Sequence, residues 1–289
     1  MQELITKANT LLEALPYIQR FAGATFVVKY GGSFMDSPDE AVRTGVARDV
    51  VFLEAVEINP VVVHGGGKRI NKALAAAGVE SRFVNGLRYT DAATVEIVDR
   101  VLSTEINPEI VDLINSLGGV AKGIAGTEIF SCKKHAPHES KGEDYGYVGE
   151  VTGVNIAPLE ECIAQGITPV ISPTARDADG QIYNCNADAA AAQAAIALTA
   201  KRLVFMSDVP GLLRDPKDDA TLISHLDIAQ VDELKKTGVI ASGMIPKVDS
   251  AVIAINAGVD KVALVNGQIH HAVLLEIFTD KGVGTEIVK

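Results

Sequence analysis

The stretch Phe26-Val27-Val28-Lys29-Tyr30-Gly31-Gly32-Ser33 decides the fold. Its apolar residues follow one another without alternation, which is typical of a strand buried in a parallel sheet. The two glycines let the backbone turn sharply and leave N–H groups free at the strand's carboxyl end. A second stretch, Val61-Val62-Val63-His64-Gly65-Gly66-Gly67-Lys68, repeats the arrangement, and a helical pattern follows each. Because a helix N-terminus carries partial positive charge, the two stretches, with Lys29 in the first, predict a pocket for phosphate or carboxylate groups.

Strand-like and helical segments alternate along nearly the whole chain. Strands are expected at 24–30, 60–64, 168–172, 202–206 and 260–265. Helices are expected at 38–57, 67–78, 91–117, 157–165, 187–200, 227–237 and 244–257. This alternation predicts an α/β fold with an open, mainly parallel sheet and helices on both faces. The stretch 121–155 differs, since its short runs between glycines predict hairpins over one edge of the sheet, with a mobile loop at 134–146.

The first twenty residues do not fit the alternation. Apolar residues spaced four and three apart form a seam on one helix face, namely Leu4, Ala8, Leu11, Leu15 and Ile18. Pro16 should kink or break this helix. The helix either lies on its own domain or packs against the same helix of another subunit. A new strand–loop–helix series begins near 199–201, which suggests a division into segments 1–20, 21–199 and 200–289.

Composition narrows the class of protein. The formal charge of −11 and pI near 5.0, with few aromatic residues, argue against a nucleic-acid partner. No apolar run reaches the roughly 18 residues that a membrane span needs, and the N-terminus does not resemble a signal peptide. Cys132, Cys162 and Cys185 fit neither a disulfide framework nor a zinc motif. We therefore expect a cytoplasmic protein without a membrane partner.

Four further clusters place polar and charged residues where strands end or helices begin. They are Asn85-Gly86-Leu87-Arg88-Tyr89-Thr90, Asn184-Cys185-Asn186-Ala187-Asp188, Met206-Ser207-Asp208-Val209-Pro210-Gly211-Leu212-Leu213 and Ser242-Gly243-Met244-Ile245-Pro246-Lys247. Lys247, in the first turn of a helix, is unfavourable there unless an anion is bound. Taken singly, each cluster is explained by an ordinary turn, a helix start or a solvated lysine. Their joint occurrence favours one anion-binding site, and without GxxxxGK[ST] or GxGxxG the chain is neither a P-loop protein nor a protein kinase.

As a set, and in this order along the chain, the motifs resemble those of the amino-acid kinase family. The match covers essentially the whole sequence, from Lys29-Tyr30-Gly31-Gly32 to Gly243-Met244-Ile245-Pro246-Lys247. It is closest to the members that use ATP to phosphorylate the side-chain carboxylate of N-acetyl-L-glutamate, the second step of arginine synthesis. The resemblance implies an α/β/α sandwich with an N-terminal assembly helix at 1–20, an amino-acid-substrate lobe at 21–199 and a nucleotide-binding lobe at 200–289.

The resemblance also implies roles for single residues. Lys29 would stabilise the transferring phosphoryl group, Lys247 would contact the nucleotide and the leaving oxygen, and Asp188 would hold both ammonium groups. Backbone N–H groups of Gly32 and Gly66 would line the path of the phosphoryl group. The amino-acid substrate would contact Gly66, Gly67, Arg88 and Asn184. ATP, with Mg²⁺ bridging its β- and γ-phosphates, would contact Lys247 together with Ser207, Asp208, Val209, Pro210, Gly211, Leu212, Leu213, Val239, Ile240, Ala241, Gly243 and Met244.

Both ends of the chain resemble the arginine-inhibited, hexameric branch of the family. That branch has an N-terminal helix like 11–20 and a C-terminal segment like 271–285. The resemblance implies a hexamer, built as a trimer of dimers through interlaced N-terminal helices, with L-arginine as feedback inhibitor. Contacts to arginine are expected from Tyr17, His271, Glu276, Gly282 and Gly284. The sequence leaves open whether a regulatory protein docks on such a hexamer.

Three other functions remain as alternatives. Within the family, the acceptor can be another carboxylate or an acylated amino acid on a carrier protein, although Arg88 and the uncharged surroundings of Asn184 favour a small free α-carboxylate. A second alternative is a silent sensor of arginine and nucleotide, which would not need Lys29, Asp188 and Lys247 together. A third, a nicotinamide-dependent oxidoreductase, is disfavoured by the missing dinucleotide fingerprint.

Overall fold

The computed structural model describes residues 1–84, 86–137, 144–241 and 243–289. Asn85, Ser242 and residues 138–143 of the loop expected at 134–146 lie outside the described residues. The α-helices are α1 (Gln2–Phe21), α2 (Gly32–Met35), α3 (Glu40–Ala55), α4 (Gly67–Ala76), α5 (Ala92–Arg100), α6 (Asn107–Ser116), α7 (Gly126–Ile129), α8 (Ala157–Ala164), α9 (Ala187–Ala197), α10 (Val231–Lys236), α11 (Met244–Asn256) and α12 (Ala272–Ile277). The strands are β1 (Thr25–Tyr30), β2 (Asn59–His64), β3 (Phe83–Val84), β4 (Leu87–Arg88), β5 (Ala121–Ile124), β6 (Phe130–Lys134), β7 (Val148–Val154), β8 (Thr168–Ile171), β9 (Thr174–Arg176), β10 (Ile182–Cys185), β11 (Arg202–Ser207), β12 (His225–Asp227), β13 (Lys261–Asn266) and β14 (Thr285–Val288).

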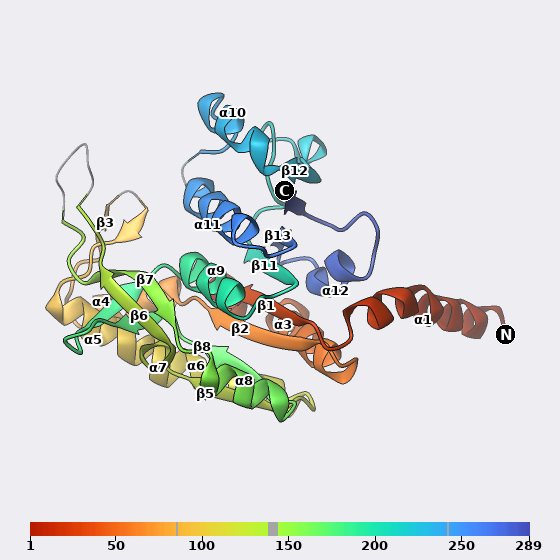
Figure 1. Cartoon of the computed structure of the whole chain (residues 1–289), viewed down its shortest axis with the longest axis horizontal. Coiled ribbons are helices and arrows are strands. Elements are labelled where there is room, and N and C mark those ends of the chain that lie inside the picture. The colour runs from red at the N-terminus through yellow and green to blue at the C-terminus, as the bar shows by residue number, and fades with distance from the viewer. Residues whose placement is uncertain (85, 138–143, 242) are drawn as a thin grey trace.

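Eight strands of the described chain form one sheet in the order β12-β14-β13-β11-β1-β2-β8-β5 (Figure 1). All neighbouring strands run parallel except β13 and β14. The predicted α/β fold with a mainly parallel sheet is thus confirmed. The chain places β2 on one side of β1 and β11 on the other, so the strand order reverses at β1. Such a reversal opens a ligand crevice at the carboxyl ends of the strands.

Helices cover both faces of this sheet and complete the three layers. Alternate residues of β1 point to opposite faces, so Val27 packs in one apolar cluster while Phe26 and Val28 pack in another. The first cluster includes residues of α8, α9 and α11, and the second includes residues of α3, α4 and α6. The sheet also continues through the β1–β11 pair, across the division expected near 199–201.

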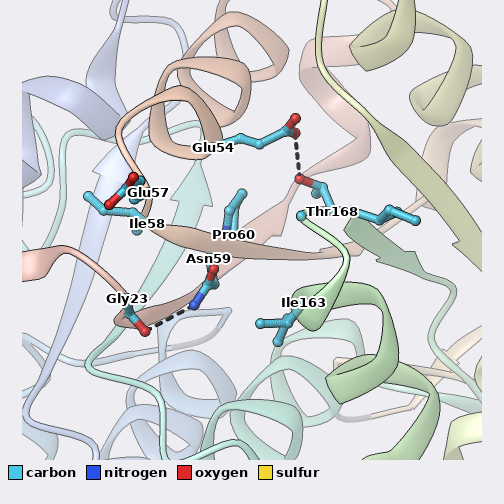
Figure 2. Close-up of a pocket in the computed structure, with 10 residues that line it drawn as sticks. Gly23, Glu54, Glu57, Ile58, Asn59, Pro60, Ile163 and Thr168 are labelled. Carbon is cyan, nitrogen blue, oxygen red and sulfur yellow. Dashed lines mark hydrogen bonds between the residues drawn. The ribbon is translucent and has the colours of Figure 1, made fainter.

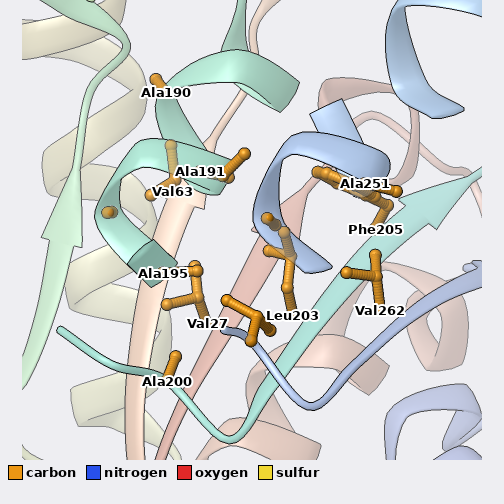
Figure 3. Packing of buried hydrophobic residues seen from close by; sticks show 14 of the residues in the cluster. Val27, Val63, Ala190, Ala191, Ala195, Ala200, Leu203, Phe205, Ala251 and Val262 are labelled. Carbon is orange, nitrogen blue, oxygen red and sulfur yellow. The ribbon is translucent and has the colours of Figure 1, made fainter. Parts of the chain in front are cut away.

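The alanine-rich helix α9 lies close against the sheet because its buried face consists of small side chains. Figure 3 shows Ala191 and Ala195 of α9 above Val27 and Val63, beside α11 with Ala251. Larger residues on α9 would hold it farther from β1 and α11. The small side chains of α9 therefore let its first turn, which carries Asp188, lie close to both β1 and α11.

The segment 121–155 differs in part from the prediction. β6 and β7 form the expected antiparallel hairpin, and together with β9 and β10 they close a barrel that was not predicted. The residues 121–124 instead form β5, the edge strand of the main sheet, parallel to β8. β9 and β10 were not predicted, since strands of 3 and 4 residues carry little local pattern.

The long helix predicted at 91–117 is one continuous helical rod with a change of type in its middle. α5 passes into a π-helix at Val101–Ile106, which passes into α6. Leu102 and Ile106 of the π-helix face Gly66, where a Cβ atom would lie 2.8 Å from Leu102 Cδ2 and 2.5 Å from Ile106 Cδ1. A larger residue at that position would have to displace these two side chains.

α1 extends away from the body of the protein along its N-terminal half (Figure 1). Leu4, Leu11 and Leu12 are 63%, 71% and 62% exposed, whereas Phe21 at the other end is buried in the core. Of the kink or break expected at Pro16, the break does not occur, because α1 runs from Gln2 to Phe21 with Pro16 inside it. The carbonyl of Leu12, which Pro16 leaves without its helical partner, lies on an exposed part of the helix where water can bind it. Among the described residues, no helix combines the length and apolarity needed to cross a membrane.

Candidate active site

Two lysines from distant parts of the chain meet on one aspartate at the carboxyl ends of the central strands. Lys29 of β1 lies with its Nζ atom 2.9 Å from Asp188 Oδ1, and Lys247 of α11 lies with its Nζ atom 2.8 Å from Asp188 Oδ2. The three side chains are 13%, 10% and 13% exposed for Lys29, Lys247 and Asp188. The group carries a net positive charge in a partly desolvated place, so it suits an anionic ligand.

Burial and the neighbouring charges act in opposite directions on this group. Burial raises the pKa of Asp188, but the ammonium groups of Lys29 and Lys247 more than offset it and lower the pKa to about 2. Burial lowers the pKa of Lys247, and Asp188 counteracts that effect. The Lys247 ammonium also lies 5.2 Å from the centre of the Phe205 ring, whose face attracts cations. Asp188 therefore stays ionised and favours the protonated form of Lys247.

The glycine clusters border this group. Gly31 and Gly32 link β1 to α2, and Gly65 and Gly66 link β2 to α4, with the Gly65 N–H donating to the Tyr30 carbonyl at 2.8 Å. The two turns are therefore joined directly at the strand ends. No acceptor among the described residues pairs with the Gly66 N–H, so this donor is free for a ligand.

The residues predicted to bind the amino-acid substrate are connected with one another. The Arg88 guanidinium donates from Nη2 to the Gly67 carbonyl at 3.3 Å and from Nη1 to the Ser81 hydroxyl. Asn184 Nδ2 donates to the Thr90 hydroxyl at 3.2 Å, and that hydroxyl donates to the Arg88 carbonyl at 2.9 Å. The structure thus brings Gly67, Arg88 and Asn184 to one place.

Arg88 is a buried cation without a fixed counter-charge in the described residues. It is only 7% exposed, and burial lowers its pKa. Its carbon Cζ lies 4.7 Å from the centre of the Phe83 ring in the β3–β4 hairpin, which fixes the guanidinium plane. A buried guanidinium with unused donors fits a carboxylate, which it can hold through two parallel hydrogen bonds.

The predicted nucleotide-binding residues follow β11 and precede α11. Ser207 ends β11, and the loop Asp208–Leu213 turns back through Leu212, whose N–H donates to the Thr285 hydroxyl at 2.8 Å. The charge of Asp208 acts on Lys247, so this loop lies beside the lysine pair. The side chains of Leu212, Leu213 and Ile240 are buried in the protein interior, which leaves mainly their backbone available to a ligand. Gly243 and Met244 stand at the start of α11, four and three residues before Lys247, and Val239 and Ala241 precede them.

Four of the five predicted arginine contacts gather around the segment 276–284. The Tyr17 hydroxyl donates to Asp280, and the Tyr17 ring packs edge-on against Phe278. Glu276 Oε2 accepts hydrogen bonds from the Val283 N–H at 2.9 Å and the Gly284 N–H at 3.3 Å. A Cβ atom on Gly282 would lie 2.4 Å from this carboxylate, so the loop requires glycine there. Burial raises the pKa of Glu276.

The fifth predicted arginine contact, His271, lies elsewhere. It stands at the opposite end of α12, and its Nδ1 atom lies 2.7 Å from Asp49 Oδ1 of α3. His271 is therefore turned toward α3, while Glu276 faces the loop that follows α12.

The cavity drawn in Figure 2 is separate from all of these residues. It has a volume of about 320 Å³ and lies where Asn59 begins β2 and Thr168 begins β8, at the amino ends of the strands. Glu54 accepts a hydrogen bond from the Thr168 hydroxyl there at 3.0 Å. The predicted site lies at the carboxyl ends of the same strands, so the cavity carries no part of it.

Sequence reasoning missed several residues that shape the site. Thr90 connects Arg88 to Asn184, and it was available as the last residue of the quoted Asn85–Thr90 motif. Asn107 lies behind the second glycine cluster and contacts His64, but nothing in the helical pattern around it marks it. No group of three or more histidine, cysteine, aspartate or glutamate residues among those described could hold a metal ion.

Comparison with known proteins finds both a matching family and a similar protein over nearly the whole chain. A model of the amino acid kinase family matches residues 24–266. A protein named acetylglutamate kinase from Thermoanaerobacter sp. (strain X514) is 47% identical over 285 residues, which cover 99% of this chain and 94% of that protein.

Among solved structures, N-acetylglutamate synthase from Neisseria gonorrhoeae, complexed with coenzyme A and N-acetyl-glutamate, is similar with a TM-score of 0.85 and 25% identity. That match covers 98% of this chain and 63% of the synthase. The same synthase complexed with coenzyme A and L-arginine is similar with a TM-score of 0.80 and 25% identity, over 96% of this chain and 64% of the synthase.

Proposed function

This chain belongs to the amino acid kinase family, and we propose that it transfers the γ-phosphoryl group of ATP to the side-chain carboxylate of N-acetyl-L-glutamate. The product is N-acetyl-L-glutamyl 5-phosphate, and the reaction is the second step of arginine biosynthesis. The observation that carries the proposal is the buried Asp188 between the ammonium groups of Lys29 and Lys247.

The chemistry requires cations rather than a base. A carboxylate with a reference pKa of about 4.3 is already ionised at neutral pH, so no group has to remove a proton from the nucleophile. The barrier arises because this anion must approach a polyanionic phosphate, and two like charges about 4 Å apart repel by roughly 4 kcal/mol at an effective dielectric near 20. Fixed positive groups that face the transferred phosphoryl group offset this repulsion.

Each charged residue has a separate task in this proposal. Lys29 stabilises the transferring phosphoryl group, and Lys247 neutralises the leaving oxygen on the nucleotide side. Asp188 holds both ammonium groups in place, which its contacts of 2.9 Å and 2.8 Å support. The backbone N–H groups of Gly32 and Gly66 donate to the phosphoryl oxygens.

Substrate selection follows from the buried guanidinium. Arg88 holds the α-carboxylate of the substrate through two hydrogen bonds, beside Asn184 and the backbone of Gly66 and Gly67. Free glutamate carries an ammonium group near that carboxylate, and the positive Arg88 disfavours it. An N-acetylated substrate has no such charge.

Mg²⁺ would be bound mainly through the phosphates of the nucleotide, as is common in kinase sites, and would offset part of their negative charge. The segments Ser207–Leu213 and Val239–Ala241, with Gly243 and Met244, cradle ATP in this proposal.

Regulation and assembly form a second part of the proposal. We infer a cytoplasmic hexamer, a trimer of dimers joined through α1, that L-arginine inhibits. The exposed Leu4, Leu11 and Leu12 on the projecting half of α1 support an apolar contact with another subunit. The half-buried carboxylate of Glu276 beside Gly282 and Gly284, with Tyr17 hydrogen-bonded to Asp280 of the same segment, supports a site for the arginine guanidinium, and the similar synthase was solved with L-arginine.

Trapping of the acyl phosphate tests the proposed reaction. The protein is incubated with ATP, Mg²⁺ and hydroxylamine, and the hydroxamate is measured for N-acetyl-L-glutamate, free glutamate and a carrier-bound acylated acid. We expect product from N-acetyl-L-glutamate and little from glutamate. Product from the carrier-bound acid alone would show that the protein is a kinase of a carrier-bound acylated amino acid. Binding of nucleotide and arginine without any product would indicate a sensor.

A further inference from the structure

His64 is the last residue of β2 and is completely buried, with 0% exposure. Burial lowers its pKa to about 4, so the imidazole is neutral at physiological pH. It has no place in the proposed chemistry, although it directly precedes the glycine cluster that borders the site.

The hydrogen bonds of His64 select one tautomer. Nε2 lies 3.2 Å from Asn107 Nδ2, which can only donate, so Nε2 accepts and the ring proton sits on Nδ1. Nδ1 lies 3.1 Å from the Gly65 carbonyl oxygen and donates to it. The amide of Asn107 cannot be reversed, because Nδ2 also donates to the Val170 carbonyl at 2.8 Å, where an oxygen would be repelled.

Asn107 is itself fixed from a third strand. It is 3% exposed, and its Oδ1 atom faces Gly123 of β5, where a Cβ atom would lie 2.1 Å away. Val170 belongs to β8, so the hydrogen bonds and this contact connect β5, β8 and β2 near the carboxyl ends of the strands. The network ends on one peptide group, the one between Gly65 and Gly66.

That peptide group contains the donor assigned to the phosphoryl group. In a planar trans peptide, the C=O and N–H bonds point in opposite directions. The hydrogen bond from His64 to the Gly65 carbonyl therefore fixes the direction of the Gly66 N–H. On the other side, the side chains of Leu102 and Ile106 of the π-helix occupy the space that a Cβ atom on Gly66 would take.

We propose that His64 is a positioning residue, which, held by Asn107, aims the Gly66 N–H at the transferred phosphoryl group. The inference rests on the proposed function for its kinetic consequence, but the geometry of the network can be tested without it. His64 acts through the Gly65–Gly66 peptide and transfers no proton.

Two substitutions at His64 separate positioning from packing. His64→Leu fills similar space without a donor, whereas His64→Asn places an amide N–H where Nδ1 stands and restores the bond to Gly65. Loss of a donor of this type lowers kcat by about 100- to 1000-fold in other enzymes, and a misaimed donor should lose part of that. We expect His64→Leu to lower kcat by roughly tenfold or more with KM for N-acetyl-L-glutamate within about threefold, and His64→Asn to recover most of kcat.

A remote variant gives a second perturbation. Gly123→Ala pushes a Cβ atom against the Asn107 amide from the sheet edge and should lower kcat in the same way as His64→Leu. Gly153→Ala is the matched control in a strand, because its added Cβ would have ordinary contacts, 3.7 Å to Ser131 Cβ being the closest. It should leave kcat unchanged. An equal effect of both alanines, or a kcat of His64→Leu within about threefold of wild type, would overturn the proposal.

The ¹⁵N NMR spectrum of the imidazoles provides a readout independent of activity. The His64 signals are those present in the wild type and absent in His64→Asn. Their chemical shifts should show a neutral ring with its proton on Nδ1 and should not change from about pH 5.5 to about pH 8. A ring protonated on Nε2, or one that becomes charged in this range, would overturn the network. If the wild type forms no hydroxamate from N-acetyl-L-glutamate, the proposed function fails while the NMR result still decides the tautomer.

Discussion

Replacement of Asp188 by asparagine is the sharpest perturbation of the site. In the wild-type protein the ammonium groups of Lys29 and Lys247 lie 2.9 Å and 2.8 Å from the carboxylate oxygens of Asp188. The variant keeps the size of this side chain but removes the negative charge that both ammonium groups contact. Each pair contributes roughly 4 kcal/mol of attraction at a charge separation near 4 Å and an effective dielectric near 20. Because removing one partner of a buried pair costs about 3–5 kcal/mol, we expect the free energy of unfolding at pH 7 to fall by about that amount.

The pH dependence of the variant gives the sign of the effect. Burial already lowers the pKa of Lys247, and without Asp188 the pKa falls further. The folded variant then binds fewer protons than the unfolded chain, so its stability rises as pH increases from neutral toward the lysine pKa of about 10.4. Turnover should fall over the same range, since the cation that the phosphoryl group needs is lost.

Chemical denaturation and the hydroxamate assay measure both quantities on one preparation. Asp260→Asn is the matched control, because Asp260 pairs with Lys201 at the protein surface, where the side chains are 47% and 42% exposed. That pair should contribute less than about 1 kcal/mol, and its loss should leave turnover unchanged. The reasoning is refuted if Asp188→Asn costs no more stability than Asp260→Asn, or retains more than about a third of wild-type turnover.

Four other substitutions test separate parts of the account. Lys29→Ala should raise the barrier by roughly 3–4 kcal/mol, and a loss of turnover below about threefold in the hydroxamate assay would show that its role is misassigned. Arg88→Lys should raise KM for N-acetyl-L-glutamate by about tenfold with little change in kcat, since an ammonium cannot form the two-point contact, and an equal fall in kcat would contradict this. Glu276→Gln should abolish arginine inhibition, and retained inhibition would exclude this residue from the effector site. The same variant should raise the melting temperature of the arginine-free protein, because burial disfavours the charged form of Glu276. Leu11→Arg should reduce the mass of the assembly in light scattering, and an unchanged mass would contradict the role of α1.

Acid sensitivity follows from the same aspartate. Asp188 has a pKa of about 2 in the folded protein and an ordinary value of 3.8. A lowered carboxyl pKa contributes stability that is present above the ordinary value and is lost as pH falls toward the folded one. Acid titrations should show this loss between about pH 4 and about pH 2 in the wild type, and Asp188→Asn should lack it.

Much of the architecture could be predicted because it rests on local pattern. The unbroken apolar runs that contain Val27, Val62 and Val204 identify strands buried on both faces, and the structure has them in β1, β2 and β11. In a parallel sheet the carboxyl ends of neighbouring strands lie at the same edge. Lys29, near the end of its strand, and the helix starts at Asp188 and Lys247 are therefore expected at that one edge. That these three side chains meet follows from the sheet order, which local pattern alone does not state.

The features that were missed depend on contacts between distant residues. β9 and β10 are stabilised by pairing within the closed barrel, so their sequences need little strand character. The π-helix at Val101–Ile106 is composed of ordinary helical residues, and its contact with Gly66 becomes visible only in three dimensions. Likewise, the hydrogen bond between His64 and Asn107 joins residues whose separation in sequence hides their contact.

A crystal structure with Mg²⁺, ADP, aluminium fluoride and N-acetyl-L-glutamate tests the central claim most directly. The account predicts that the Nζ atoms of Lys29 and Lys247 both contact the phosphoryl mimic or the adjoining nucleotide oxygens while Asp188 still contacts both. Arg88 should hold the α-carboxylate of the substrate. A complex in which the mimic binds away from the two lysines, or in which either ammonium group points out of the shared site, would contradict the account.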